Sequence, residues 1–166
     1  MSQNVSANLD KALTALILEV FRFNGRMLAV GDGLGRDLGL TSARWQILSA
    51  IEQEPLPVAH VAFNRGLTRQ SVQRVVDLLA EEQMVTFAEN PRHRRAKLIV
   101  ITEKGRTSLA AVVMRHAHWV NKIACGIDPD AIADTTAMLA TLLQRIERDQ
   151  TNETDRIVLR TKERQR

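Results

Sequence analysis

Cysteine is almost absent from this chain, and long apolar runs are absent altogether. The single thiol, Cys125, has no second cysteine with which to form an internal disulfide, so packing must supply the stability. No apolar stretch approaches the roughly 20 residues that a membrane-spanning helix needs, and residues 1–10 lack the basic and apolar segments of a secretory signal. We therefore expect a cytoplasmic protein with no membrane partner.

The sequence also lacks the residue patterns of the common catalytic and metal sites. It has no Ser/His/Asp spacing, no carboxylate pair in an apolar setting and no phosphate-binding loop. The glycines of residues 31–39 resemble a dinucleotide fingerprint only in part, because Arg36 stands where the third glycine belongs. His116 and His118 fall on nearly opposed faces of a helix, which makes them a poor metal pair. We predict no catalysis, no cofactor and no bound metal.

Positive charge is what the sequence has in excess, and this charge is concentrated. The chain has 23 Lys and Arg residues against 19 Asp and Glu residues, a net charge of +4. Residues 65–106 hold nine of those cations and five of those acids, so this short stretch carries the whole excess. Such a field favours an anionic partner, of which a phosphate backbone is the commonest. Solvated surface charge is the alternative.

Length and apolar spacing predict a single, mostly helical domain over 166 residues. A first helix is predicted over residues 9–28, because apolar residues recur there at alternating spacings of four and three: Leu9, Leu13, Leu16, Val20 and Phe23. The glycines that follow, within residues 31–39, predict a loop. Thr41 and Pro57 are placed to begin two further helices, as an N-cap and as a first-turn residue.

Residues 58–82 have the pattern of a helix-turn-helix. Gly66 can form the turn and Thr68 can cap the second helix, whose buried face is predicted by apolar residues at helical spacing: Val72, Val75, Val76 and Leu79. Long polar side chains fall on the opposite face: Arg69, Gln70, Gln73, Arg74 and Asp77. Such a helix can lie in the DNA major groove, where Arg pairs with guanine, Gln with adenine, and Ser71 can serve a base or a phosphate. An ordinary surface helix is the alternative.

Residues 84–101 predict a β-hairpin with a cationic tip. Residues 84–89 and 97–101 have strand patterns, and "NPRHRRA" between them contains the turn formers Asn90 and Pro91. The cations of this segment are Arg92, Arg94, Arg95 and Lys97. A hairpin beside a recognition helix can lay arginines along the minor groove, where negative potential is concentrated. We therefore interpret the hairpin as a DNA-binding wing.

These motifs resemble the MarR (multiple antibiotic resistance regulator) family of winged-helix transcription factors. The resemblance is carried by "LTSARWQIL", "LTRQSVQRVVDLLAEEQMV" and "NPRHRRAKLIVITEKG", and the order and spacing are similar from Leu9 to Ile146. Arg95 matches the arginine that this family sends into the minor groove. The chain departs from the family pattern at Asn90 and His93, where aspartates are usual, and at Gln83, where a glycine commonly ends the recognition helix.

The resemblance implies a homodimer whose N- and C-terminal helices form the interface, and the sequence supports this independently. Asp128 followed by Pro129 is a strong helix start. Beyond it runs an apolar seam at four-three spacing: Ile132, Thr136, Leu139, Leu143 and Ile146. Together with the stripe near the N-terminus, this is more apolar surface than one small winged helix covers. A helical cap within a single chain is the alternative.

We therefore expect a mostly α fold with a small β-hairpin wing, a winged helix-turn-helix flanked by N- and C-terminal dimerisation helices. Residues 1–166 form one domain in this prediction. It comprises dimerisation helices over 9–30 and 106–148, a winged helix-turn-helix DNA-binding region over 41–105, and a charged tail over 149–166.

The predicted function is sequence-specific DNA binding by a dimeric transcriptional regulator, a repressor that reads a pseudo-palindromic operator. Base contacts are expected from Gln70, Ser71, Gln73 and Arg74, wing contacts from Arg92, Arg94 and Arg95, and phosphate contacts from Arg69 and Lys97. A nonspecific architectural DNA binder and a winged helix used for protein contact are the alternatives.

The resemblance also implies a small aromatic or phenolic effector, bound between the dimer helices and the winged region. The candidate wall residues, chosen by position only, are Phe23, Met27, Trp45, Met114 and His118. Each of these residue types is also common in a protein core.

Overall fold

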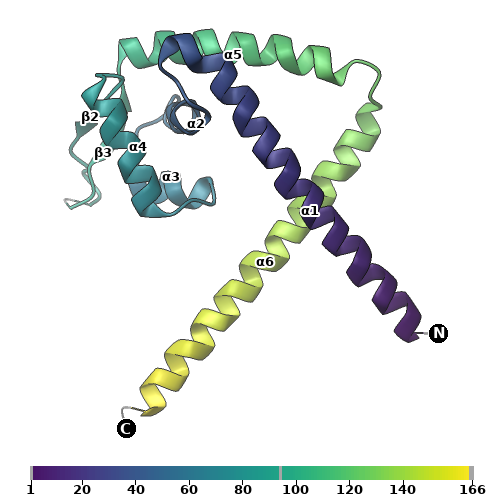
Figure 1. The fold of residues 1–166 in the computed structure, drawn as a ribbon. Helices are drawn as coiled ribbons and strands as arrows, with labels where there is room; N and C mark the ends of the chain where they lie inside the picture. Colours follow the sequence, from purple (N-terminus) through teal and green to yellow (C-terminus); the bar gives the residue numbers. More distant parts are fainter. Residues whose placement is uncertain (1, 94, 165–166) are drawn as a thin grey trace. The chain divides into compact units, whose positions relative to one another are not determined.

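Helices dominate the computed structural model, and one small antiparallel sheet accompanies them (Figure 1). In chain order the elements are α1 (Ser2–Gly35), the 3₁₀ turn η1 (Arg36–Leu38), α2 (Ser42–Ala50), β1 (Leu56–Pro57), α3 (Val58–Asn64), α4 (Arg69–Glu81), β2 (Val85–Ala88), β3 (Leu98–Ile101), α5 (Glu103–Ala124) and α6 (Pro129–Arg164). The predicted fold class, mostly α with a β-hairpin wing, is confirmed.

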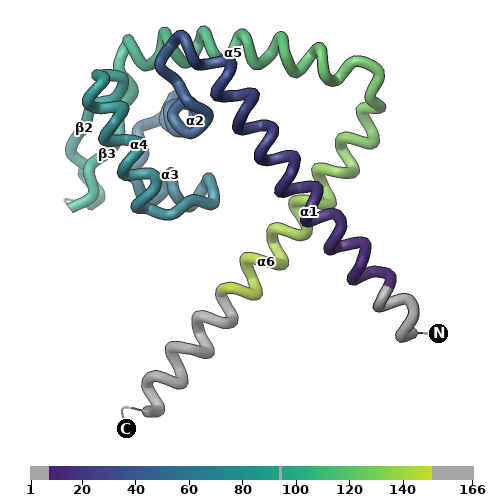
Figure 2. Tube along the Cα trace, viewed as in Figure 1, coloured from purple at the N-terminus to yellow at the C-terminus, as the bar shows by residue number. Residues whose placement is uncertain are grey.

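The structure describes the backbone of residues 2–93 and 95–164, and the side chains of residues 8–93 and 95–150 (Figure 2). Two compact units are present, Met1–Val120 and Asn121–Arg166, and the boundary falls inside α5. The predicted division into one domain with terminal dimerisation helices stays a prediction.

Three helices begin at the residues that capping chemistry predicts. Before α2, Thr41 Oγ1 accepts a hydrogen bond from the Arg44 amide at 3.3 Å, and before α4, Thr68 Oγ1 accepts one from the Ser71 amide at 3.1 Å. In the second unit, Asp128 Oδ1 accepts from an amide of the first turn of α6 at 3.1 Å. Each side chain satisfies an amide that has no partner within its own helix.

The predicted loop over residues 31–39 is wrong for residues 31–35, which continue α1 to Gly35. At two of these positions α1 packs too closely for any side chain, against Ser42 at the start of α2 and against Leu40 just before it. A Cβ at Gly31 would collide with Ser42 Oγ, and one at Gly35 would collide with the carbonyl oxygen of Leu40. Only Gly39, at φ +68°, has the backbone conformation of a turn that favours glycine.

The sheet has the strand order β1-β3-β2, with both pairs antiparallel. In the β2–β3 hairpin, Val85 pairs with Ile101 and Phe87 with Ile99, which confirms the predicted hairpin. The third strand, β1, was not predicted from the sequence. It includes Pro57, which was predicted in the first turn of a helix but precedes α3 as its N-cap in an extended conformation. Because β1 has only two residues, it offers no alternating pattern to detect.

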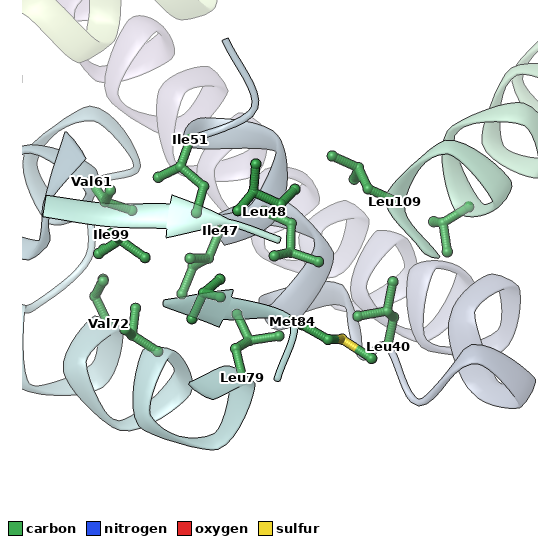
Figure 3. Close-up of a cluster of buried hydrophobic side chains, with 14 of the residues drawn as sticks. Leu40, Ile47, Leu48, Ile51, Val61, Val72, Leu79, Met84, Ile99 and Leu109 are labelled. Carbon is green, nitrogen blue, oxygen red and sulfur yellow. The ribbon is translucent and has the colours of Figure 1, made fainter. Parts of the chain in front are cut away.

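The hydrophobic core lies where α2, α3, α4 and α5 meet the sheet, as Figure 3 shows. Of the predicted stripe on α4, Val72, Val76 and Leu79 are fully buried and Val75 is half-buried, so the face prediction is confirmed. Leu109 brings the start of α5 into the same cluster. This packing fixes α4 by its buried face and leaves the opposite face free.

Gln83 ends the α4 turn in a left-handed conformation, with φ at +59°. Its amide donates to the Ala80 carbonyl at 2.9 Å, and the next amide, of Met84, donates to the Leu79 carbonyl at 2.8 Å. These bonds close the helix end as a glycine would at this position. The departure from the family pattern therefore changes the residue and keeps the geometry.

Gln83→Gly is expected to raise the free energy of unfolding by about 0.5–1 kcal/mol. The left-handed conformation costs a side-chain-bearing residue about 1–2 kcal/mol, a strain that glycine avoids. Glycine also gives the unfolded chain more backbone freedom, which offsets roughly half of this stabilisation. Urea denaturation of the variant measures the change. Gln83→Asn should fall between the two proteins, because Asn tolerates this conformation better than Gln. Equal stability of all three would contradict the expectation.

Candidate nucleic-acid interface

Two adjacent grooves lie beside the N-terminal half of α4. The first, the helix–wing groove, has a volume of about 730 Å³ and runs between α4 and the wing. The second, the wing-tip groove, has a volume of about 760 Å³ and lies between α3 and the tip of the wing. Arg69, the first residue of α4, lines both grooves.

The structure brings most of the predicted DNA-contacting residues to these grooves. The helix–wing groove is lined by five of them, from both elements: Arg69, Gln70, Gln73, Arg95 and Lys97. The wing-tip groove adds Arg92. Arg74 and Ser71 are exposed on α4 and line neither groove, and Arg94 lies outside the described residues.

Ser71 is engaged in the cap of its own helix. Its hydroxyl donates to the Thr68 carbonyl at 2.8 Å, and the Thr68 hydroxyl donates to Ser71 Oγ at 3.0 Å. The two residues therefore satisfy each other at the N-terminus of α4. A base contact from Ser71 would have to compete with this arrangement.

Gln73 is also engaged, by a residue one turn further along α4. Its amide nitrogen Nε2 donates to Asp77 Oδ1 at 2.7 Å. Both side chains are exposed and both line the helix–wing groove. Asp77 is the one acid among the residues that line this groove.

Hydrogen bonds tie the base of the wing to the end of α4. The Thr102 hydroxyl donates to the Gln83 carbonyl at 2.8 Å, and Lys104 Nζ donates to the Glu82 carbonyl at 2.7 Å. The Glu82 carboxylate in turn pairs with Arg44 of α2 at 2.8 Å. α4 and the wing are thus anchored to one another at the end away from the grooves.

The wing tip turns at Asn90. The side-chain oxygen of Asn90 accepts a hydrogen bond from the Arg92 amide at 3.0 Å. The backbone carbonyl of Asn90 accepts one from the His93 amide at 3.1 Å. These two hydrogen bonds stabilise the turn locally. It directs Arg92 and His93 to the wing-tip groove.

Several residues that line the grooves were not predicted from the sequence. Phe87 of β2 is 39% exposed and forms part of the helix–wing groove, and His60 of α3 lines the wing-tip groove. Strand alternation places Phe87 and Val85 on one face, so sequence could have placed Phe87 but not its exposure. His60 lies opposite the buried Val61 and Ala62, a face that helical periodicity identifies.

The proposed effector residues lie apart from these grooves. Phe23 and Met114 are 67% and 72% exposed, His118 is exposed, and Met27 and Trp45 are half-buried. Among them, Trp45 alone belongs to the described ring cluster, in which its ring lies 5.5 Å from His116 and His116 lies 6.0 Å from Trp119. His118 was the residue predicted from the sequence, whereas the structure turns His116 toward Trp45.

Two further features involve Trp45 and Arg115, the residue before His116. Trp45 Nε1 is buried, and within the described residues it has no hydrogen-bond partner. Arg115 donates to Asp37 Oδ1 at 2.5 Å and to the Leu34 carbonyl at 2.8 Å, which joins α5 to the end of α1. The hydrogen bond from Arg115 lowers the pKa of the Asp37 carboxyl, and the carboxylate raises the pKa of Arg115.

In the part of the chain that the structure describes, no group of three or more His, Cys, Asp or Glu side chains could hold a metal ion. Among the helices so described, none is both long and apolar enough to span a bilayer.

Comparison with known proteins gives three kinds of match. The model of the MarR family matches residues 38–96, which run from the end of η1 through the wing tip. An uncharacterized protein of Mycobacterium tuberculosis is 33% identical over 135 residues, which cover 81% of this chain and 94% of that protein. Its counterpart in Mycobacterium bovis matches to the same extent.

The fold matches several solved structures, among them that of the transcriptional regulator BldR. BldR from Sulfolobus solfataricus aligns with a TM-score of 0.73 at 22% identity, over 82% of this chain and 97% of that one. CouR from Rhodococcus jostii RHA1 was solved bound to p-coumaroyl-CoA. It aligns with a TM-score of 0.69 at 22% identity, over 76% of this chain and 90% of that one. These likenesses establish the fold.

Proposed function

The chain belongs to the MarR family of transcriptional regulators, and from this premise we propose that it is a homodimeric repressor that reads a two-fold symmetric DNA site. The observation that carries the proposal is the helix–wing groove, whose cations come from both the recognition helix and the wing. A winged helix that puts α4 in the major groove and the wing in the minor groove holds a phosphate strand between them.

The proposed roles follow from position. Gln70, Gln73 and Arg74 of α4 read base edges, with Ser71 beside them, and Arg69 and Lys97 hold phosphates. Arg92, Arg94 and Arg95 supply the wing contacts, of which Arg95 is the minor-groove residue. Because several of these Lys and Arg side chains neutralise phosphates, the affinity for DNA is expected to fall steeply as the salt concentration rises.

Dimerisation is proposed because each unit exposes apolar side chains that water does not favour. On α1 these include Leu9, Leu18, Phe21 and Phe23, each at least 62% exposed, and on α6 they are Ile132, Met138, Leu143 and Ile146, each at least 53% exposed. So many large apolar side chains exposed on two helices favour burial at an interface. Two copies related by a two-fold axis would present recognition helices about 34 Å apart, one turn of DNA.

We also propose that a small aromatic effector binds beside Trp45. CouR, which has a similar fold, was solved bound to p-coumaroyl-CoA. Here the Trp45 indole N–H is buried and has no acceptor among the described residues, and the Trp45 ring lies 5.5 Å from that of His116. An effector with an oxygen acceptor would satisfy that donor. Phe23, Met27, Met114 and His118 remain the other proposed wall residues.

The test of DNA reading is selection of bound duplexes from a random pool, followed by affinity measurements over a range of salt concentrations. A two-fold symmetric consensus with a steep negative salt slope is the expected result. Binding without any consensus would favour an architectural protein. A complete lack of binding would favour a winged helix used for protein contact.

Lys97→Ala and Arg74→Ala are expected to separate phosphate contacts from base contacts. Lys97→Ala should weaken binding to all sequences alike and reduce the salt slope by about 1. Arg74→Ala should cost about 1–3 kcal/mol on the selected site and relax the preference at one position. Fluorescence anisotropy with selected and scrambled duplexes measures both, and Lys11→Ala on α1 removes the same charge elsewhere. Identical profiles for the Lys97 and Arg74 variants would contradict these roles.

A further inference from the structure

The hydrogen bond between Gln73 and Asp77 fixes the orientation of a base-reading side chain. A carboxylate only accepts hydrogen bonds, so the atom of Gln73 that lies 2.7 Å from Asp77 Oδ1 must be the amide nitrogen. The carbonyl oxygen of the amide, Oε1, therefore points away from Asp77. A free glutamine on a helix surface would have no such constraint.

This orientation leaves Gln73 with a particular set of free hydrogen-bonding groups. The amide nitrogen has two hydrogens, and Asp77 takes one of them. What remains is one N–H donor and one oxygen acceptor. In the major groove, adenine presents the complementary pair, the N7 acceptor and the N6 amino donor.

Guanine presents two acceptors in the major groove, N7 and O6. A free glutamine could pair with guanine by giving both hydrogens of its amide nitrogen to these acceptors. With one hydrogen held by Asp77, that alternative is removed, and either Oε1 or the Asp77 carboxylate would face a guanine acceptor without a proton between them. The pair is complementary to adenine and opposed to guanine.

The location of the pair fits this role. Gln73 and Asp77 are four residues apart, on adjacent turns of one face of α4, and both line the helix–wing groove together with Gln70 and Arg69. Their helix is held by the Thr68 cap at one end and by the buried Val72, Val76 and Leu79 along its inner face. The other charged residues that line the groove are all cations, so an acid there weakens phosphate attraction, and general affinity does not explain its place.

We propose that Asp77 is a specificity-determining residue of the DNA interface, which positions the Gln73 amide so that it accepts adenine and rejects guanine. The inference rests on the proposed function, because it requires that α4 reads DNA sequence. In this proposal Asp77 acts by orienting the Gln73 amide and by excluding guanine.

The experiment uses the full-length protein and its selected duplex. Gln73→Ala first identifies the position at which this side chain reads a base, as the position whose preference disappears. Duplexes with A·T or G·C at that position then give a ratio of dissociation constants for the wild type, Asp77→Ala and Glu81→Ala. Glu81 is an exposed acid on the same helix, so Glu81→Ala removes the same charge without removing the hydrogen bond to Gln73.

The wild type is expected to prefer adenine over guanine by roughly 5- to 150-fold, the discrimination that a good bidentate pair provides. In Asp77→Ala the preference should fall to within a few-fold, chiefly because guanine binds better, while Glu81→Ala should keep the wild-type preference. The same adenine preference in Asp77→Ala, an equal loss in Glu81→Ala, or a consensus that Gln73→Ala leaves intact would each overturn the inference. Failure to select any consensus would instead overturn the proposed function.

Discussion

Gly35→Ala is expected to lower the free energy of unfolding by about 2–3 kcal/mol, the upper part of the usual cost of overpacking. The added Cβ would collide with the Leu40 carbonyl oxygen and lie 3.0 Å from the carbonyl carbon and the Cβ of the same residue. The Leu40 amide also donates to the Gly35 carbonyl at 3.0 Å, so the two backbones cannot separate without breaking a bond. Relief would require α1 to move away from the start of α2.

Gly33→Ala provides the matched control, two residues earlier in the same helix. A Cβ at Gly33 meets no atom of the described chain within 4 Å. Alanine should therefore raise the free energy of unfolding by about 0.5–1 kcal/mol, since it restricts the unfolded chain more than glycine does. Guanidinium denaturation at one fixed protein concentration compares the variants, because dimerisation would make stability depend on concentration. Opposite signs are expected, and equal effects would mean that the close contact with Leu40 does not constrain α1.

Gly31, Gly33 and Gly35 were predicted to form a loop, but the structure places them in α1. Glycine is common both in loops and at close backbone contacts, and only the second environment applies at Gly31 and Gly35. The identity of the neighbour, Ser42 or Leu40, is a tertiary fact that spacing within residues 31–39 does not contain. The helix that ends at Gly35 was therefore predicted too short.

Elements with a strong local signal were predicted well. Thr68 caps α4, Val72 and Val76 are buried, and β2 and β3 pair as the predicted hairpin. Each depends on residues close in sequence or on a simple period. In contrast, β1 pairs with β3 across more than 40 residues and has no period of its own.

The site was predicted as a set of residues rather than as an arrangement. Periodicity put Gln73 and Asp77 on one face of a helix, and their separation of four residues allows the contact that the structure contains. Charge alone did not reveal that Arg69 would line two grooves, since this depends on how α3, α4 and the wing pack. The ring contact of Trp45 with His116 likewise depends on the rotation of α5.

Leu143→Asp is expected to convert the protein from a dimer to a monomer and to weaken operator binding by about 10²–10⁴-fold. Leu143 is 57% exposed in the single chain and lies on the apolar seam of α6, so an aspartate there would be solvated in the monomer and buried in the dimer. The loss of affinity follows because two linked recognition helices bind with the advantage of an effective concentration, which a monomer lacks.

Gln144→Asp introduces the same charge at the next residue, which is also exposed but about 100° around the helix from Leu143. It should remain dimeric and bind the operator as the wild type does. Sedimentation equilibrium gives the oligomeric state, and titration of full-operator and half-site duplexes gives the affinities. A monomeric Leu143→Asp that keeps wild-type affinity for the half-site shows that α4 and the wing are intact, so the defect lies in assembly. If Leu143→Asp stays dimeric with unchanged operator affinity, the interface does not include this seam, and the exposed stripe of α1 becomes the surface to substitute next.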